Sequence, residues 1–282
     1  MALTINTNLG SMIIQKNLND ATEALNKSIE RMTTGYKINS PADDPAGYAV
    51  AARMETTLSS VSVAQDNTAI GSSMLSTAES NLELISTHLQ RVRDLTEEAA
   101  NGTYGDDSID AIKAEITARL EEIDRIAATT EFNGVKLLDG SSGDITLQIG
   151  IDSSTNSRLT IGSGIFDSAE ASTLMGVSGT DFLAHFVTGG TTYDDALDEV
   201  DAALDAITTR ETAIGSYGNR LDSVVEALDV QEFNVTSSLS TVRDADVAKE
   251  SSEYIKAQIL QQASATLLAT ANQAPSVALS LI

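Results

Sequence analysis

Apolar residues recur along this chain at alternating steps of three and four, over segments long enough to form helices. This spacing places them on one face of a helix that packs against other helices. The first row comprises Leu75, Ala78, Leu82, Ile85, Leu89, Val92, Thr96 and Ala99; the second comprises Ile109, Ile112, Ile116, Leu120 and Ile123. The segment between them, "NGTYGDD" at 101–107, is short and holds two glycines. We therefore predict two antiparallel helices, the second ending near residue 128.

The repeat returns late in the chain with a strict period of seven. Its members are Val200, Ile207, Ile214, Leu221, Leu228, Val235 and Val242, and the expected companion row is Leu197, Leu204, Val225 and Leu239. A continuous helix here would be about 60 Å long, a length that favours a rod over a globule. Gly215 and Gly218 are the places where it could bend or end.

Between these helical blocks the period changes to two. "DITLQIGID" (144–152) alternates apolar and polar residues and predicts a half-buried strand, with strand and turn pieces in "FNGVKLLDG" and "SRLTIGSGIF". The fold class expected is mainly α: an elongated antiparallel helical rod, similar to a coiled-coil bundle, with a small β-hairpin and loop region at about 130–193.

The two ends of the chain have matching apolar stripes and little charge. One stripe is Ile14, Leu18, Ala21, Leu25 and Met32, with Ser28 in the remaining position; the other is Leu260, Leu267 and Ala274, flanked by Ala263, Leu268, Ala271 and Ala278. No ionisable side chain follows Lys256. Short isolated helices are marginal in water, so each end needs the other end, or copies from other chains. We interpret both ends as interfaces.

Charge and composition limit the classes of molecule that this chain is expected to bind. The net charge is −24, with residues 1–60 summing to −1 and residues 249–282 to 0, so the acidity lies in the middle. Nucleic acid and anionic membranes both require a basic face, which argues against them as partners. The chain has no cysteine, no basic start followed by an apolar stretch, and no run of about twenty apolar residues. Neither a secretory signal peptide nor a membrane span is expected.

Candidate catalytic chemistry is sparse. His88 and His185 lie far apart and neither belongs to an H-E-x-x-H zinc motif. "GSGIFD" at 162–167 lacks the third glycine of a nucleotide-binding loop, and "SPADDPAG" at 40–47 lacks the alternating ligands of a calcium loop. The sequons "NGT" and "NVT" are common by chance. We expect no catalytic site, no metal and no cofactor, and take "SPADDPAG" as a turn that meets neighbouring subunits.

Long segments of the chain resemble bacterial flagellins, the subunits of the flagellar filament. They are the opening residues 1–54, from "MALTINTNLG" through "SPADDPAG" to "YAVAARM", then "LQRVRDLTEEAANGT", "EITARLEEIDRIAATTEFNGVKLLDG" and the closing "ILQQASATLLATANQAPSVALSLI". The resemblance implies that residues 1–44 and 236–282 form an inner terminal coiled coil whose core contacts include Ile14, Leu18, Leu25, Met32, Leu260, Leu267, Ala271 and Ala274. Residues 45–235 would form a rod domain, without the outer variable domains.

The resemblance also implies partners. They are other copies of the chain in a helical homopolymer, an export chaperone at the C-terminal helix, and the cap and hook-junction proteins. Export would proceed unfolded through the flagellar type III apparatus to an extracellular filament. Some flagellins bind Toll-like receptor 5, and the matching positions are Gln90, Arg91, Leu95 and Glu115. Arg91 and Leu95 share a helical face, and an arginine beside an exposed leucine suits a binding hot spot. The alternative is that Leu95 packs on a neighbouring helix and Arg91 pairs with an acid.

Two other classes compete with a filament subunit. A cytoplasmic coiled-coil scaffold would explain the heptads and the acidity, but not the neutral ends that enclose a β-containing middle. A hook–filament junction protein shares the terminal helices, although "LQRVRDLTEEAANG" and "FNGVKLLDG" favour the filament subunit.

Overall fold

The computed structural model describes residues 7–187 and 193–279, with side chains up to residue 273. The chain forms two compact units: a terminal unit of Met1–Leu58 and Phe233–Ile282, and a central unit of Ser59–Glu232. The helices are α1 (Leu9–Thr34), α2 (Pro45–Ala100), α3 (Asp106–Thr129), α4 (Ala171–Met175), α5 (Gly179–Ala184), α6 (Tyr193–Arg243) and α7 (Val247–Leu279). Helices α2 and α6 contribute residues to both units.

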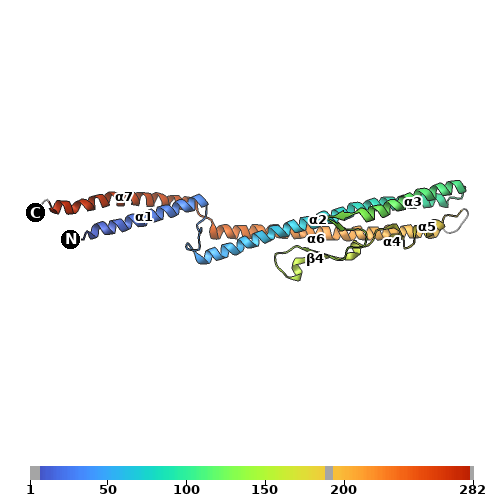
Figure 1. The fold of residues 1–282 in the computed structure, drawn as a ribbon, viewed down its shortest axis with the longest axis horizontal. Helices are drawn as coiled ribbons and strands as arrows, with labels where there is room; N and C mark the ends of the chain where they lie inside the picture. Colours follow the sequence, from blue (N-terminus) through green and yellow to red (C-terminus); the bar gives the residue numbers. More distant parts are fainter. Residues whose placement is uncertain (1–6, 188–192, 280–282) are drawn as a thin grey trace. The chain divides into compact units, whose positions relative to one another are not determined.

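The core of the central unit lies between α2, α3 and α6, which run side by side, with α2 antiparallel to the other two (Figure 1). Every member of the two rows expected on α2 and α3 is buried, from Leu75 to Ala99 and from Ile109 to Ile123. On α6 the seven-residue row is buried from Val200 to Leu228. The helix continues through Gly215 and Gly218. The rows on α2 and α3 and the continuous late helix are confirmed, whereas the last two members of its row, Val235 and Val242, are only half-buried and no helix end occurs at the two glycines.

The companion row expected on α6 is only half-buried: Leu204 packs against the core, but the fully buried positions beside it and Leu197 lie one residue earlier. Leu197 and Leu204 are only half-buried, whereas their neighbours Ala196 and Ala203 are fully buried. Alanine lets α6 approach the other helices closely, and the adjacent leucines lie at the edge of the contact. The apolar pattern alone favoured the larger side chains, because it does not record which of two adjacent apolar positions faces the core.

The β region contains two antiparallel pairs. Strand β1 (Glu131–Phe132) pairs with β2 (Val135–Lys136), and β3 (Ile145–Gln148) pairs with β4 (Arg158–Ile161). The first pair turns through Asn133 and Gly134, whose φ angles of 49° and 81° suit the two-residue hairpin turn that Asn-Gly favours. Short 3-10 turns at Thr155–Ser157 and Ser163–Ile165 flank β4. The predicted fold class, mainly α with a small β region and paired terminal helices, is confirmed.

Candidate subunit interface

Helices α1 and α7 of the terminal unit pair in antiparallel fashion. Each begins at a side-chain cap: Asn8 Oδ1 accepts a hydrogen bond from the Ser11 amide at 3.1 Å, and Asp246 Oδ1 accepts one from the Ala248 amide at 2.9 Å. Helix α1 ends at Gly35, whose φ of 75° is the left-handed conformation that glycine adopts without strain. Caps at these positions satisfy backbone groups that the helix ends leave unpaired.

The seam between α1 and α7 is built from small residues. Ala21 and Ser28 of α1 are buried, as are Ala257 and Ser264 of α7. These side chains lie seven residues apart on each helix, which keeps them on one face. Small side chains let the two helices approach closely, but they bury little apolar area. The pair therefore gains little hydrophobic stabilisation from its own contact.

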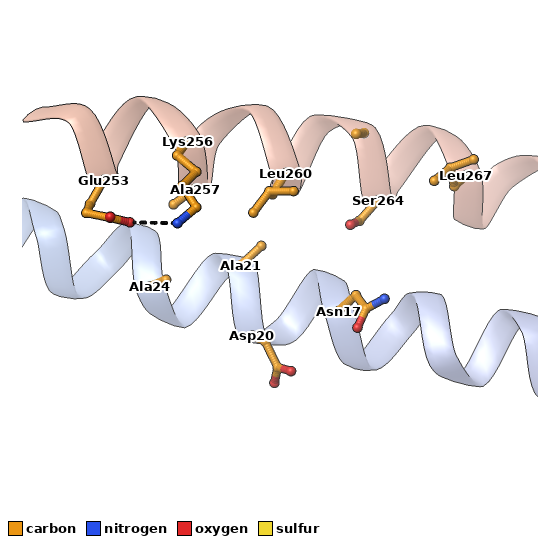
Figure 2. A pocket seen from close by; sticks show the side chains of 11 residues that line it. Asn17, Asp20, Ala21, Ala24, Glu253, Lys256, Ala257, Leu260, Ser264 and Leu267 are labelled. Carbon is orange, nitrogen blue, oxygen red and sulfur yellow. Dashed lines mark hydrogen bonds and ion pairs between the residues drawn. The ribbon is translucent and has the colours of Figure 1, made fainter.

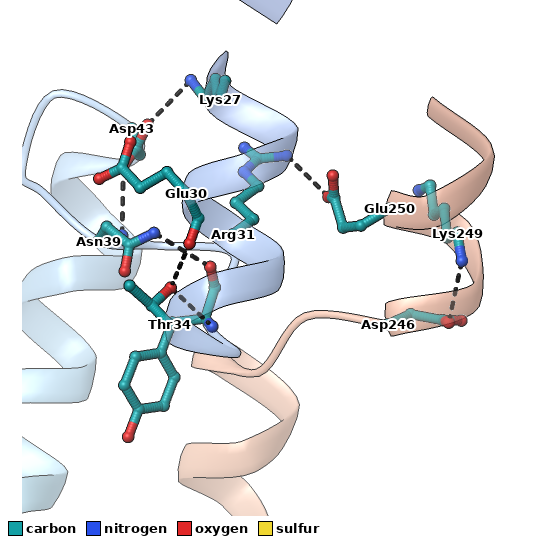
Figure 3. Close-up of polar contacts among 10 residues, drawn as sticks. Lys27, Glu30, Arg31, Thr34, Asn39, Asp43, Asp246, Lys249 and Glu250 are labelled. Carbon is teal, nitrogen blue, oxygen red and sulfur yellow. Dashed lines mark hydrogen bonds and ion pairs between the residues drawn. The ribbon is translucent and has the colours of Figure 1, made fainter. Parts of the chain in front are cut away.

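Polar contacts cross this seam in a single register. Arg31 Nη1 lies 3.0 Å from Glu250 Oε1, and both side chains are largely buried (Figure 3). Gln261 Nε2 donates to Thr22 Oγ1 at 3.1 Å in the middle of the pair. Near the far end, Asn8 Nδ2 donates to the Ala271 carbonyl and Ser11 Oγ to Asn272 Oδ1, both at 2.8 Å.

The predicted contact residues divide between the two sides of the pair. Ile14, Leu18, Leu25 and Met32 of α1 are half-buried in the stripe that includes Ala21 and Ser28, and Ala271 of α7 is half-buried too. Leu260 and Leu267 are instead 49% and 56% exposed, so they do not belong to the seam with α1. The side chain of Ala274 lies outside the described residues.

Several large apolar side chains remain exposed on this pair. On α1 these are Leu9, Met12, Ile13 and Ile29; on α7 they are Val247, Ile255, Ile259, Leu260 and Leu267. Leu260 and Leu267 border a groove of about 500 Å³ between the helices, floored by Ala21, Ala24 and Ala257 (Figure 2). An exposed apolar patch of this kind marks an interaction site.

The loop between α1 and α2 is held by its two aspartates. Asp43 accepts hydrogen bonds from the backbone amides of Asn39 and Ser40 and lies 2.8 Å from Lys27 Nζ (Figure 3). The hydrogen bond from Lys27, followed by that from Ser40, holds the pKa of Asp43 well below its ordinary value. Asp44 caps α2 through the amides of Ala46 and Gly47. The adjacent carboxylates of "SPADDPAG" therefore have structural partners within the chain.

A short backbone bridge joins this loop to the segment before α7. The Lys37 amide donates to the Arg243 carbonyl at 2.7 Å, and the Ala245 amide donates to the Gly35 carbonyl at 2.8 Å. The Arg243 guanidinium lies 4.2 Å from the centre of the Tyr36 ring, a cation–π contact, and also pairs with Glu55. These contacts hold the C-terminal end of α1 beside the N-terminal end of α7.

The receptor-binding residues expected on α2 and α3 are partly brought together. Arg91 Nε lies 3.1 Å from Glu115 Oε1, and this hydrogen bond raises the pKa of Arg91 and lowers that of Glu115. Gln90 is exposed. The expectation of an exposed Leu95 is wrong, because its side chain is 1% exposed. Helix α2 is covered by both α3 and α6, so its buried face is wider than a two-position seam.

Some kinds of site are absent from the described part of the chain. None of the helices within residues 7–187 and 193–279 is long and apolar enough to cross a membrane. No group of three or more histidine, aspartate or glutamate side chains in those ranges could hold a metal ion. His185, at the C-terminal cap of α5, lies 3.4 Å from Glu199 of α6.

Comparison with known proteins agrees with this arrangement. The family model described as the bacterial flagellin N-terminal helical region matches residues 5–143, and the one described as the bacterial flagellin C-terminal helical region matches residues 197–282. A flagellin of Halalkalibacterium halodurans is 32% identical over 280 residues, covering 99% of this chain and 100% of the relative. Flagellin B of Vibrio cholerae is 30% identical over 375 residues, covering 100% of both.

The solved structure of a putative flagellar hook-associated protein from Vibrio parahaemolyticus superposes with a TM-score of 0.61, and the match covers 72% of this chain and 100% of that one. At 18% identity it shares the fold alone. The Vibrio cholerae alignment is longer than the 282 residues of this chain, so that relative carries residues that are missing here, whereas the Halalkalibacterium relative aligns at nearly equal length. The match of both family models and of relatives along the whole chain shows that it belongs to the bacterial flagellin family, as a short member without the outer variable domains.

Proposed function

We propose that this chain polymerises through α1 and α7, whose exposed apolar sides dock on the same helices of neighbouring copies. As a flagellin, the chain is a structural subunit of the flagellar filament, which is extracellular. The observation that carries the proposed contact is the distribution of side chains on the pair: the most buried positions between the two helices are small residues, while Leu260, Leu267 and other large apolar residues remain exposed to solvent.

The physical reason is that large apolar side chains of α1 and α7 stay in contact with water in a single chain. Burying apolar surface is favourable by about 25 cal/mol per Å², and the outward residues gain this only against a partner. The partner surface must be apolar and shaped to a helix, and the groove beside Leu260 has both properties. The tail beyond Lys256 carries no charge, so copies of it do not repel one another. Residues 1–44 and 236–282 are proposed as this inner assembly domain, and residues 45–235 as the rod domain.

A contact between different parts of the surface generates an open helical polymer. Contacts that pair two different patches repeat without closing unless the rotation returns to its start. The groove and the exposed residues Leu9, Met12 and Ile13 of α1 are different parts of the surface of one subunit, and we propose that they meet between copies. The cap and hook-junction proteins are expected to use the same helices at the ends of the filament.

Export is the second part of the proposal. We expect passage through the flagellar type III apparatus in an unfolded state, with a chaperone covering the apolar side of α7 beforehand. The chain supports this in two ways: it has no cysteine that could cross-link in transit, and its α1/α7 pair buries little area alone. Addition of purified chaperone should protect α7 amides from hydrogen exchange. Equal exchange with and without it would exclude α7 as the chaperone site.

Receptor binding is the third part. We propose that Gln90, Arg91 and Glu115 contact Toll-like receptor 5, with Leu95 supporting them from the core rather than touching the receptor. Arg91 and Glu115 present a polar pair on the exposed side of α2 and α3. Replacement Arg91→Ala should weaken binding of the soluble receptor ectodomain. The matched control is Arg125→Ala, which removes another exposed arginine–glutamate pair on α3. Equal affinity of both variants and the parent would contradict this assignment.

Electron microscopy tests the polymer directly. The full chain should form long filaments on addition of filament seeds, and a version lacking residues 1–40 and 245–282 should remain a soluble monomer. If the full chain remained monomeric under the same conditions, the termini would be docking sites for another protein, as in the scaffold interpretation.

A further inference from the structure

We propose that Arg31 and Glu250 determine the register in which α1 lies along α7, selecting one heptad alignment among several that the seam would otherwise accept. The proposal deepens the proposed function, because the surface offered to other copies is made by both helices together. It concerns the pairing within one chain, so it can be tested separately from filament growth.

The seam repeats every seven residues on both helices. The most buried row of α7 consists of Glu250, Ala257 and Ser264, and α1 presents Ala21 and Ser28 to it. Sliding one helix by seven residues exchanges one small seam residue for the next, such as Ala21 for Ser28, and the larger half-buried residues Leu18, Leu25 and Met32 of α1 also recur every seven residues and exchange with one another. Shape therefore distinguishes poorly between the observed alignment and its neighbours, which differ by about 10 Å along the axis.

The charged pair breaks this repeat. Glu250 occupies a row of small residues, its side chain is 11% exposed, and its carboxylate lies 3.0 Å from Arg31. A slip of one heptad would separate the two and leave the carboxylate in the seam without its cation. Removing one partner from a buried pair is strongly destabilising, because the remaining charge is poorly solvated. Lys27, the next cation on α1, lies 2.8 Å from Asp43 and is already engaged.

The other contacts across the pair discriminate less. The bridge between Gly35–Lys37 and Arg243–Ala245 consists of backbone hydrogen bonds at exposed or half-buried positions. Such groups exchange protein partners for water at small net loss. Gln261 to Thr22 is a neutral contact between half-buried side chains, for which the same argument holds. The hydrogen bonds from Asn8 to Ala271 and from Ser11 to Asn272 are also neutral, and they lie at part-buried or exposed positions where water can replace them. The charged pair is therefore the contact whose loss on slipping is not compensated by water.

Engineered cysteines can report the register, because the chain has none of its own. Thr22→Cys with Gln261→Cys reports the observed register, since these residues face each other. Thr22→Cys with Leu268→Cys, and Thr22→Cys with Tyr254→Cys, report slips of one heptad in either direction. Full-length chains are oxidised in assembled and in soluble form, and the internal cross-link is measured as a faster-migrating monomer in non-reducing electrophoresis.

The parent should cross-link at 22/261 and hardly at the slipped pairs. In the Arg31→Leu/Glu250→Leu background, two leucines keep the helices paired but remove the discrimination, so the ratio of slipped to native cross-link should rise about tenfold or more. The charge-exchanged background, Arg31→Glu with Glu250→Arg, should restore the parental ratio. The control Glu253→Leu/Lys256→Leu removes an exposed pair within α7 and should leave the ratio unchanged.

Unchanged register in the double-leucine background would overturn the proposal and assign the register to the backbone bridge. Loss of selectivity in the Glu253→Leu/Lys256→Leu control would overturn it too, because general charge removal would then be the cause. Filaments are scored in the same samples. A selective 22/261 cross-link without filaments would contradict the proposed function and support the register inference; filaments with unselective parental cross-links would do the reverse.

Discussion

The central and terminal units differ in how they treat the apolar faces of their helices: the central unit buries them, and the terminal unit leaves much of them exposed. In the central unit, α2, α3 and α6 enclose large apolar side chains such as Leu82, Ile116 and Ile207, all fully buried. In the terminal unit, two helices meet through alanine and serine, and side chains of the size of Leu267 lie in water. Three helices can surround a core and exclude water from it, whereas two helices leave most of their surface exposed.

The comparison teaches that similar heptad patterns can serve folding in one place and assembly in another. A third helix converts an apolar stripe into a core that stabilises the subunit by itself. Without a third helix, the apolar stripe stays exposed to water. The favourable free energy of burying it is gained only when another molecule covers it. The central unit should therefore be the stable part of a lone subunit, and the terminal unit the part whose stability depends on neighbours.

The largest expected effect is loss of assembly. Leu267→Asp places a charge at the edge of the groove between α1 and α7, where burial against another copy would require its desolvation. We expect no filaments by electron microscopy, with the unfolding temperature of the central unit unchanged. Leu25→Asp, in the half-buried stripe of α1, should also abolish them. Leu267→Met keeps an apolar side chain and should assemble. Normal filaments from Leu267→Asp would contradict the division between the two units.

The next effect concerns the stability of the central unit. Ile116→Ala removes buried methyl groups from the core between α2, α3 and α6. The free energy of unfolding should fall by about 2–5 kcal/mol in urea titrations. The control Ile70→Ala, at a side chain that is 55% exposed on α2, should change it by less than about 0.5 kcal/mol. Equal losses in both variants would mean that burial does not distinguish these positions.

A smaller effect should appear with pH at the entrance to the terminal unit. The folded pKa of Asp43 is depressed below its ordinary value of 3.8 by Lys27 and Ser40, so the unfolded chain binds its proton first as pH falls. The stabilisation is fully present above pH 3.8 and is lost as pH falls below it. The protection factors of the amides at Asn39 and Ser40, which are exchange rates corrected for the intrinsic effect of pH, should fall in this range. Asp43→Asn should show the faster exchange at neutral pH, with little further change on acidification.

The smallest effect is expected at the exposed pair of α2 and α3. Arg91→Ala removes an ion pair whose partners are 44% and 38% exposed, and such pairs contribute little to stability. The unfolding midpoint should match that of the parent, so that any change in receptor affinity reports contact rather than misfolding. A clear drop in the unfolding midpoint would show that the Arg91–Glu115 pair contributes substantially to the stability of the central unit.

The sequence was sufficient to predict most of the helices and much of the core. Regular apolar spacing located α2, α3 and α6 because each of them buries one continuous face. It was less informative where a helix is covered on more than one side, as at Leu95, or where alanine is buried beside a half-exposed leucine, as at Ala203 and Leu204. Hydrophobicity scales rank residue types, and burial at such positions depends on the direction of the neighbour.

The candidate interface shows the same limit more strongly. The tail was interpreted as an interface from its lack of charge, but the seam with α1 uses Ala257 and Ser264 rather than Leu260 and Leu267. In the sequence, Glu250 is one of the few charged residues near the C-terminus, and its charge is balanced by neighbouring lysines. Its spacing of seven from Ala257 was the available signal, because a carboxylate in an otherwise small and neutral row requires a partner on the facing helix.

Only three residues, Asp244–Asp246, separate α6 from α7, and the cap at Asp246 is what starts the second helix anew. The direction of the 33 residues of α7 therefore depends on a very short break. A substitution there that favours helix could fuse the two segments into one continuous helix, with α7 carried away from α1 while every other residue stays the same. The chain encodes a change of architecture in a single turn, and insertions or deletions in it would be far less tolerated than in a long surface loop.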